Sequence, residues 1–103
     1  SSFDQIHHAM WTLRDDNGLT FRLTRGSVKT IGRAVRADFV VDAALVSRVH
    51  CRVSVQPDGR LEVQDLESTN GTFVNGKKVD CAVLKDGDEL GVGRVTLKVE
   101  KVH

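Results

Sequence analysis

Hydrophobic and polar residues alternate along most of this chain with a period of two. The clearest stretch covers residues 50–56, where Cys51, Val53 and Val55 alternate with polar side chains. Successive side chains of a β-strand point to opposite faces, so this pattern predicts a strand with one buried face and one solvated face. The segment 61–64 alternates in the same way, and Pro57-Asp58-Gly59 between the two segments predicts a β-hairpin.

Short runs of the same kind fill the rest of the chain. They predict further strands over residues 10–14, 20–23, 28–31, 39–41, 72–74, 77–79 and 95–102. Asn75-Gly76 is the strongest hairpin signal among the turns. No window of about ten residues shows the 3.6-residue period of a helix. The pattern therefore predicts an all-β sandwich of two antiparallel sheets, with its loops gathered at the two ends.

Composition narrows the class of protein further. The chain has 103 residues, which is the size of one domain. No apolar run approaches the roughly 20 residues of a membrane helix, and the first thirty residues lack a signal-peptide core of about 7–15 apolar residues. A net charge of +1 argues against nucleic-acid binding through a broad basic surface. We therefore expect neither a membrane nor a nucleic acid as a direct partner.

The cysteines and the adjacent histidines of the chain do not indicate a metal site. Cys51 and Cys81 are too few for a disulfide framework, which favours a reducing compartment such as the cytoplasm. Neither forms a zinc-type spacing with His50. The adjacent His7 and His8 cannot close a zinc site alone, so segment 1–9 is interpreted as a tail and residues 10–103 as the domain. No metal and no cofactor is expected.

Three predicted loops concentrate groups that bind phosphate. The first carries Gly32-Arg33, the second covers residues 47–50, and the third covers residues 68–72. Arginine offers planar, permanently charged donors that match phosphate oxygens, and Ser and Thr hydroxyls add neutral donors. Asn can donate one hydrogen bond and accept another, which suits a peptide backbone. If these loops meet at one end of the sandwich, they form an anion site.

Two enzymatic interpretations have less support than a binding site. Ser47 and His50 could act as a nucleophile and its base, but the spacing indicates no third group to orient the histidine. Gly91-Val92-Gly93 resembles a fragment of a dinucleotide-binding loop, but no helix is predicted after it. We therefore expect a protein without catalytic residues.

The three loop motifs follow one another in a defined order. Gly32-Arg33, Ser47-x-x-His50 and the run STNGT over residues 68–72 resemble the motifs of the forkhead-associated (FHA) domain. Asp65-Leu66, Asn75-Gly76 and Gly87-Asp88-x-Leu90 extend the resemblance over about residues 11–102. The resemblance implies a sandwich of about eleven short strands that binds phosphothreonine peptides through loops at one end.

The resemblance also assigns roles to the ligand-binding residues. Arg33, Ser47, Arg48 and Thr69 correspond to residues that contact the phosphothreonine, and Asn70 corresponds to one that holds the peptide backbone.

Other positions would support the site or select the ligand. Gly32, His50, Gly71 and Asn75 correspond to structural positions that shape the binding loops. Members of the family commonly read the third residue after the phosphothreonine with the loop that here spans residues 42–46. Leu45 in that loop predicts a preference for an aliphatic residue over an acidic one.

The implied function is a non-catalytic, phosphothreonine-dependent peptide-binding module in signalling. Its partner would be a phosphorylated protein or a phosphorylated segment of its own parent protein, with a Ser/Thr kinase adding the phosphate. Such a module is expected in the cytoplasm, or in the nucleus of a eukaryote. The alternative is an interaction domain that keeps the fold, ignores phosphate and uses a sheet face.

Overall fold

The computed structural model describes residues 10–102; segment 1–9, with His7 and His8, lies outside the described residues. Eleven strands follow one another, with the bounds β1 Trp11–Arg14, β2 Thr20–Leu23, β3 Val28–Gly32, β4 Phe39–Val40, β5 Cys51–Val55, β6 Leu61–Asp65, β7 Thr72–Val74, β8 Lys77–Val79, β9 Cys81–Leu84, β10 Glu89–Val92 and β11 Val95–Lys101. Residues 10–102 contain no helix with the length and hydropathy that a membrane span requires.

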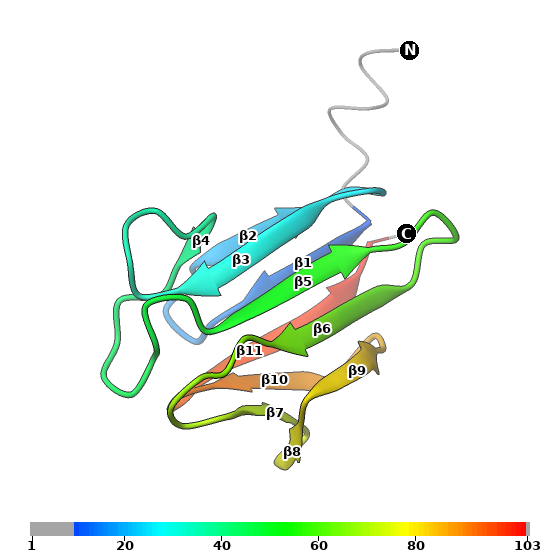
Figure 1. Cartoon of the computed structure of the whole chain (residues 1–103). Helices are drawn as coiled ribbons and strands as arrows, with labels where there is room; N and C mark the ends of the chain where they lie inside the picture. Colours follow the sequence, from blue (N-terminus) through cyan, green and yellow to red (C-terminus); the bar gives the residue numbers. More distant parts are fainter. Residues whose placement is uncertain (1–9, 103) are drawn as a thin grey trace.

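The strands form two facing sheets, which confirms the predicted sandwich (Figure 1). One sheet has the order β2-β1-β11-β10-β7-β8, and the other has the order β4-β3-β5-β6-β9. All pairs are antiparallel except β3 and β4, which run parallel in the register Ile31 with Phe39. This pairing is parallel because the chain crosses back after Gly32 instead of making a tight hairpin. The second sheet is therefore mixed rather than purely antiparallel.

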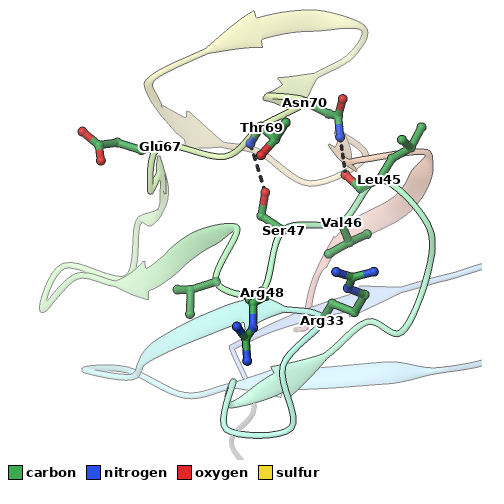
Figure 2. Close-up of a pocket in the computed structure, with 9 residues that line it drawn as sticks. Arg33, Leu45, Val46, Ser47, Arg48, Glu67, Thr69 and Asn70 are labelled. Carbon is green, nitrogen blue, oxygen red and sulfur yellow. Dashed lines mark hydrogen bonds between the residues drawn. The ribbon is translucent and has the colours of Figure 1, made fainter.

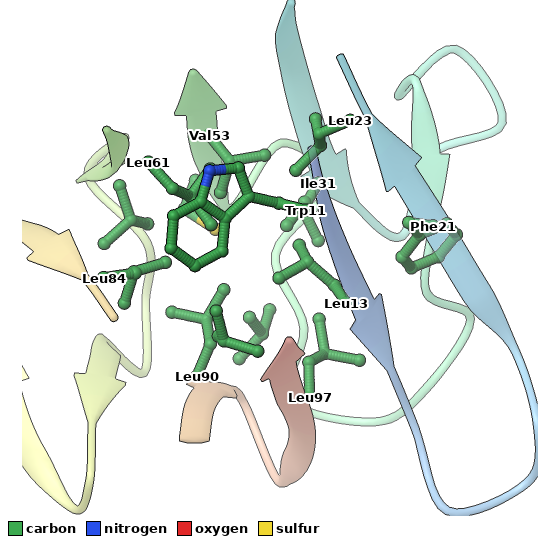
Figure 3. Close-up of a cluster of buried hydrophobic side chains, with 14 of the residues drawn as sticks. Trp11, Leu13, Phe21, Leu23, Ile31, Val53, Leu61, Leu84, Leu90 and Leu97 are labelled. Carbon is green, nitrogen blue, oxygen red and sulfur yellow. The ribbon is translucent and has the colours of Figure 1, made fainter. Parts of the chain in front are cut away.

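The two inner faces supply a single hydrophobic core (Figure 3). Its members come from the alternating positions of the strands and include Leu13, Leu23, Ile31, Val53, Leu61, Val63, Leu84, Leu90, Val92, Leu97 and Val99, all nearly or fully buried. At one edge of the sandwich, the rings of Phe21 on β2 and Phe39 on β4 stack with centroids 4.4 Å apart. This contact joins the two sheets at the edge formed by β2 and β4.

The hydrophobic pattern did not predict two of the strands, β9 and β10. In β9 only Leu84 is fully buried, because this strand lies at the edge of its sheet and pairs with β6 alone. In β10 a glycine separates the buried Leu90 and Val92, and glycine weakens a strand signal. The other strands begin and end within about one or two residues of their predicted bounds.

Strand register brings the candidate loops to one end of the sandwich. Gly32 ends β3 where β5 begins with Cys51, and Cys51 lies opposite Asp65 at the end of β6. Val92 of β10 lies opposite Thr72 at the start of β7, so the turn between β10 and β11 reaches the same end. The loops after Gly32, before Cys51 and after Asp65 therefore lie side by side (Figure 1).

Trp11 joins the core to the turn between β5 and β6. Its indole Nε1 donates a buried hydrogen bond of 2.9 Å to the Gly59 carbonyl. Replacement Trp11→Phe keeps an aromatic ring but leaves that carbonyl without its donor. We expect the free energy of unfolding to fall by about 1–3 kcal/mol.

Urea unfolding followed by far-ultraviolet circular dichroism measures this loss, since Trp11 is the single tryptophan of the chain. The control is Val83→Ala on the exposed face of β9. A Trp11→Phe protein as stable as the control would show that the indole hydrogen bond does not stabilise the fold.

Candidate functional site

A pocket of about 470 Å³ lies at the end of the sandwich where the three loops meet (Figure 2). All six residues expected to touch a ligand line it, namely Arg33, Leu45, Ser47, Arg48, Thr69 and Asn70. Val46, Val49 and Glu67 also line it, and none of these three was predicted from the sequence. The loops meet as the sandwich architecture predicted.

Backbone hydrogen bonds join the first loop to the second. The Arg33 N–H donates to the Ser47 carbonyl at 2.9 Å, and the Ala34 N–H donates to the Arg48 carbonyl at 3.1 Å. Gly32 makes this approach possible, because a Cβ atom there would lie 2.9 Å from the Val49 Cα and closer still to the Arg48 carbonyl. Only glycine lets these two stretches of backbone come so close.

Hydrogen bonds that involve side chains join the third loop to the second loop and to Leu45 just before it. The Thr69 N–H donates to Ser47 Oγ at 3.0 Å, and Asn70 Nδ2 donates to the Leu45 carbonyl at 3.0 Å, as Figure 2 shows. Leu45 has a φ of 72°, in the left-handed region that costs an L-residue about 1–2 kcal/mol. The hydrogen bond from Asn70 helps to hold Leu45 in this conformation, with its side chain 42% exposed at the pocket.

His50 connects the second loop to the third and is completely buried. Its Nδ1 accepts a hydrogen bond from the Ser47 N–H at 3.0 Å, and its Nε2 lies 2.8 Å from the Gly71 carbonyl. A carbonyl only accepts, so Nε2 carries the proton and the ring is the neutral Nε2–H tautomer. Both ring nitrogens are used by backbone groups, which leaves neither to activate the Ser47 hydroxyl as a catalytic base.

Asp65 organises the third loop. Its carboxylate accepts hydrogen bonds from the Ser68 hydroxyl, the Ser68 N–H at 3.2 Å and the Thr72 hydroxyl at 2.7 Å. Partial burial alone would raise the pKa of Asp65, but the hydrogen bonds from Ser68 and Thr72 outweigh it and hold the pKa below the usual 3.8. The Ser68 hydroxyl in turn accepts from the Gly71 N–H at 3.0 Å. Gly71 itself has a φ of 91°, as its turn role requires.

Asn75 belongs to the hairpin behind the site rather than to the pocket. It adopts a φ of 52° in the turn between β7 and β8. Its side chain donates to Asp88 at 3.1 Å and accepts from the Glu89 N–H at 2.9 Å. These bonds tie the hairpin to β10 and thereby fix β7, which begins directly after the third loop.

The charge of the pocket comes from two exposed arginines. Arg33 and Arg48 take part in none of the ion pairs found within residues 10–102, which are Arg14–Glu100, Arg60–Asp58 and Arg60–Glu62. Glu67 is the acidic residue of the lining, and its carboxylate points away from Ser47 (Figure 2). The guanidinium groups therefore remain available to an anion.

The cysteines lie outside this chemistry. Cys51 is buried in the core, and burial raises the pKa of its thiol to about 12, so it stays protonated. Cys81 is exposed, and both thiols are free. Within the part of the chain that the structure describes, no group of three or more His, Cys, Asp or Glu residues is placed to hold a metal ion.

Sequence reasoning missed the roles of two residues just before the third loop, Asp65 and Glu67. Asp65 stands out in the sequence only as part of a motif, although a carboxylate three residues before a serine is a recognisable signal for a hydrogen-bonded turn. Glu67 adopts a φ of 56°, and no local pattern predicts that conformation or its place at the pocket.

Removal of the Asp65 charge should destabilise the domain in a pH-dependent way. Because the folded-state pKa lies below 3.8, the stabilisation is fully present above that pH and is lost as the pH falls through the folded-state value. We expect Asp65→Asn to lower the free energy of unfolding by about 1–3 kcal/mol at neutral pH.

Denaturant unfolding from neutral pH into the acid range tests this expectation. The difference between wild type and Asp65→Asn should shrink as the pH drops below 3.8. Asp42→Asn, in an exposed position before the second loop, is the matched control. A deficit for Asp65→Asn that stays constant with pH would contradict the role of the carboxylate.

Several known proteins are similar to this chain in sequence, and solved structures are similar to it in fold. The ABC transporter ATP-binding/permease protein Rv1747 of Mycobacterium tuberculosis is 46% identical over 79 residues, which cover 77% of this chain and 9% of that protein. The glycogen accumulation regulator GarA of Mycolicibacterium smegmatis is 41% identical over 66 residues, 64% of this chain and 41% of the regulator. The chain thus spans less than half the length of either relative.

A solved structure matches almost the whole domain. It comes from a structural and functional analysis of phosphothreonine-dependent FHA domain interactions, and it superimposes with a TM-score of 0.84 at 33% identity, covering 91% of this chain and 98% of that one. The sequence model of the FHA domain matches residues 29–93, which is more than half of the chain. This chain therefore belongs to the FHA domain family.

Proposed function

We propose that this domain is a non-catalytic signalling module that binds peptides or proteins containing phosphothreonine. The observation that carries the proposal is the placement of two arginines, Arg33 and Arg48, beside Ser47 and Thr69 in one pocket, with neither arginine in an ion pair within residues 10–102. The likeness to a domain studied for phosphothreonine-dependent interactions supports it.

In this proposal the phosphate lies between the first two loops. Arg33 and Arg48 donate charge-assisted hydrogen bonds to its oxygens. Ser47 Oγ already accepts the Thr69 N–H, so its own proton is free to be donated to the phosphate. Thr69 lies exposed at the same pocket and contacts the phosphothreonine.

The peptide backbone is held beside the phosphate by Asn70. Its Nδ2 is bound to the Leu45 carbonyl, whereas its Oδ1 has no donor among the hydrogen bonds of residues 10–102. That oxygen can accept a peptide N–H. Leu45 then faces the residues that follow the phosphothreonine.

We place the domain at residues 10–103, since β1 lies between β2 and β11 and so completes the six-stranded sheet outside the matched 29–93. A Ser/Thr kinase would create the ligand, in a partner or in the parent protein itself. The cytoplasm is the compartment that fits two free thiols and a kinase product. Both nitrogens of His50 are engaged by backbone groups, which supports a non-catalytic role.

Loss of one phosphate contact tests the proposal. We expect Arg33→Ala to weaken binding of a phosphothreonine peptide by about tenfold to a few hundredfold, because each charge-assisted hydrogen bond contributes about 1.5–3 kcal/mol. Isothermal titration calorimetry with matched phosphorylated and unphosphorylated peptides measures the change. Arg25→Ala, in the turn at the opposite end of the sandwich, should bind like wild type.

Equal affinity of wild type for both peptides would favour an interaction domain that ignores phosphate. Unchanged affinity of a folded Arg33→Ala protein would remove Arg33 from the site.

Leu45 sets a second expectation. An aliphatic residue at the third position after the phosphothreonine can bury about 40–80 Å² against Leu45, worth about 1–2 kcal/mol. We expect a peptide with Ile there to bind about five- to thirtyfold more tightly than one with Asp. Fluorescence anisotropy with the two peptides, on wild type and Leu45→Ala, measures the preference. Tighter binding of the Asp peptide by wild type would overturn it.

A further inference from the structure

A second depression lies on the outer face of the six-stranded sheet, away from the core. It has a volume of about 250 Å³, and its lining includes Phe73, Glu89, Gly91, Gly93, Arg94 and Thr96. We name it the Phe73 groove. The phosphate pocket uses none of these residues.

Strand register explains why the groove exists. Thr72 and Val74 point to the core side of β7, so Phe73 between them points to the solvent side. Gly91 lies directly opposite Phe73 and also opposite Thr96, and it contributes no side chain. A Cβ atom on Gly91 would lie 3.1 Å from the Phe73 Cβ, so the aromatic residue packs over the glycine. An apolar ring therefore borders an unfilled space on the solvent side of the sheet.

The groove lies next to the phosphate pocket, and the two share packed walls. Gly93, in the turn between β10 and β11, sits so close to the segment before the second loop that a Cβ there would lie 2.7 Å from the Leu45 carbonyl. A Cβ on Gly71, the residue after Asn70, would lie 3.3 Å from the Phe73 ring. Leu45 and Asn70 line the pocket, whereas Gly93 and Phe73 line the groove. In Figure 2 the pair Leu45 and Asn70 stands at the edge of the pocket opposite Glu67.

We propose that the segment following the phosphothreonine continues over Leu45 and Gly93 and places one apolar side chain in the Phe73 groove. This inference rests on the proposed function and extends its ligand from the phosphate and its immediate neighbours to a second contact on the sheet. The volume of about 250 Å³ is enough for a single large side chain.

The polar rim defines the neighbours of that side chain. Glu89 and Arg94 line the groove and form none of the ion pairs found among residues 10–102. They can pair with polar or charged residues on either side of the apolar one. The ligand is therefore a phosphothreonine followed, beyond its third residue, by an apolar residue within a polar segment.

Peptides of two lengths test the proposal. The short peptide ends at the third residue after the phosphothreonine; the long one adds about six residues, which reach about 20 Å when extended, with Leu or Phe among them. A third peptide carries Ser in place of these apolar residues, and a fourth extends the short peptide before the phosphothreonine. Calorimetry with wild type should show about five- to thirtyfold tighter binding of the long apolar peptide than of the other three.

Two variants locate the contact. Phe73→Thr keeps a strand-forming residue but removes the ring, and Thr96→Lys introduces a charge at an exposed position facing Gly91. Both should bind the short peptide like wild type and lose the gain from the extension. Thr12→Lys, on the same sheet face but on β1, is the matched control and should keep the gain.

Three results would overturn the inference while the proposed function stands: equal affinity of the short and long peptides, a gain that survives both variants, or a gain that comes from the extension before the phosphothreonine. Failure of the short phosphopeptide to bind at all would overturn the proposed function and this inference with it.

Discussion

The site depends on one buried imidazole. His50 accepts the Ser47 N–H and donates to the Gly71 carbonyl, so a single side chain joins the second loop to the third. Both backbone groups would otherwise be polar groups without a partner near the core, which costs about 1–3 kcal/mol each. Because the ring is completely buried, water cannot replace it. The distance between Ser47 and Thr69, and hence the shape of the pocket, follows from this connection.

Other hydrogen bonds around the pocket also hold the binding loops in place. Asp65 holds the third loop from within through Ser68 and Thr72, and Asn70 holds Leu45 in a left-handed conformation that leucine rarely adopts. The loops are thus ordered by their own hydrogen bonds before any ligand arrives. Because the loops are already ordered, ligand binding does not carry the entropic cost of fixing them. This favours affinity and selectivity.

Positive charge is concentrated at the end of the sandwich that carries the pocket. The chain as a whole carries +1, so it offers no general attraction for polyanions. Arg33 and Arg48 nevertheless meet at one pocket without a carboxylate partner among the described residues. A single phosphate therefore finds a local positive charge that the overall composition conceals.

Local sequence patterns were enough to predict the fold class, most strand positions and six of the nine residues that line the pocket. Alternation of Cys51, Val53 and Val55 with polar neighbours, and turns such as Asn75-Gly76, are signals that act within a few residues. The motif residues could be found because each loop carries its own short pattern.

The remaining features emerge only in the folded domain, because they depend on contacts between distant segments. The parallel pairing of β3 with β4, the edge strand β9, the tautomer of His50 and the place of Glu67 at the pocket all arise from such contacts. The Phe73 groove is the clearest case, since Phe73 and Gly91 are ordinary strand residues until antiparallel register sets them opposite each other. Register follows from the packing of the whole sandwich, and no local pattern encodes it.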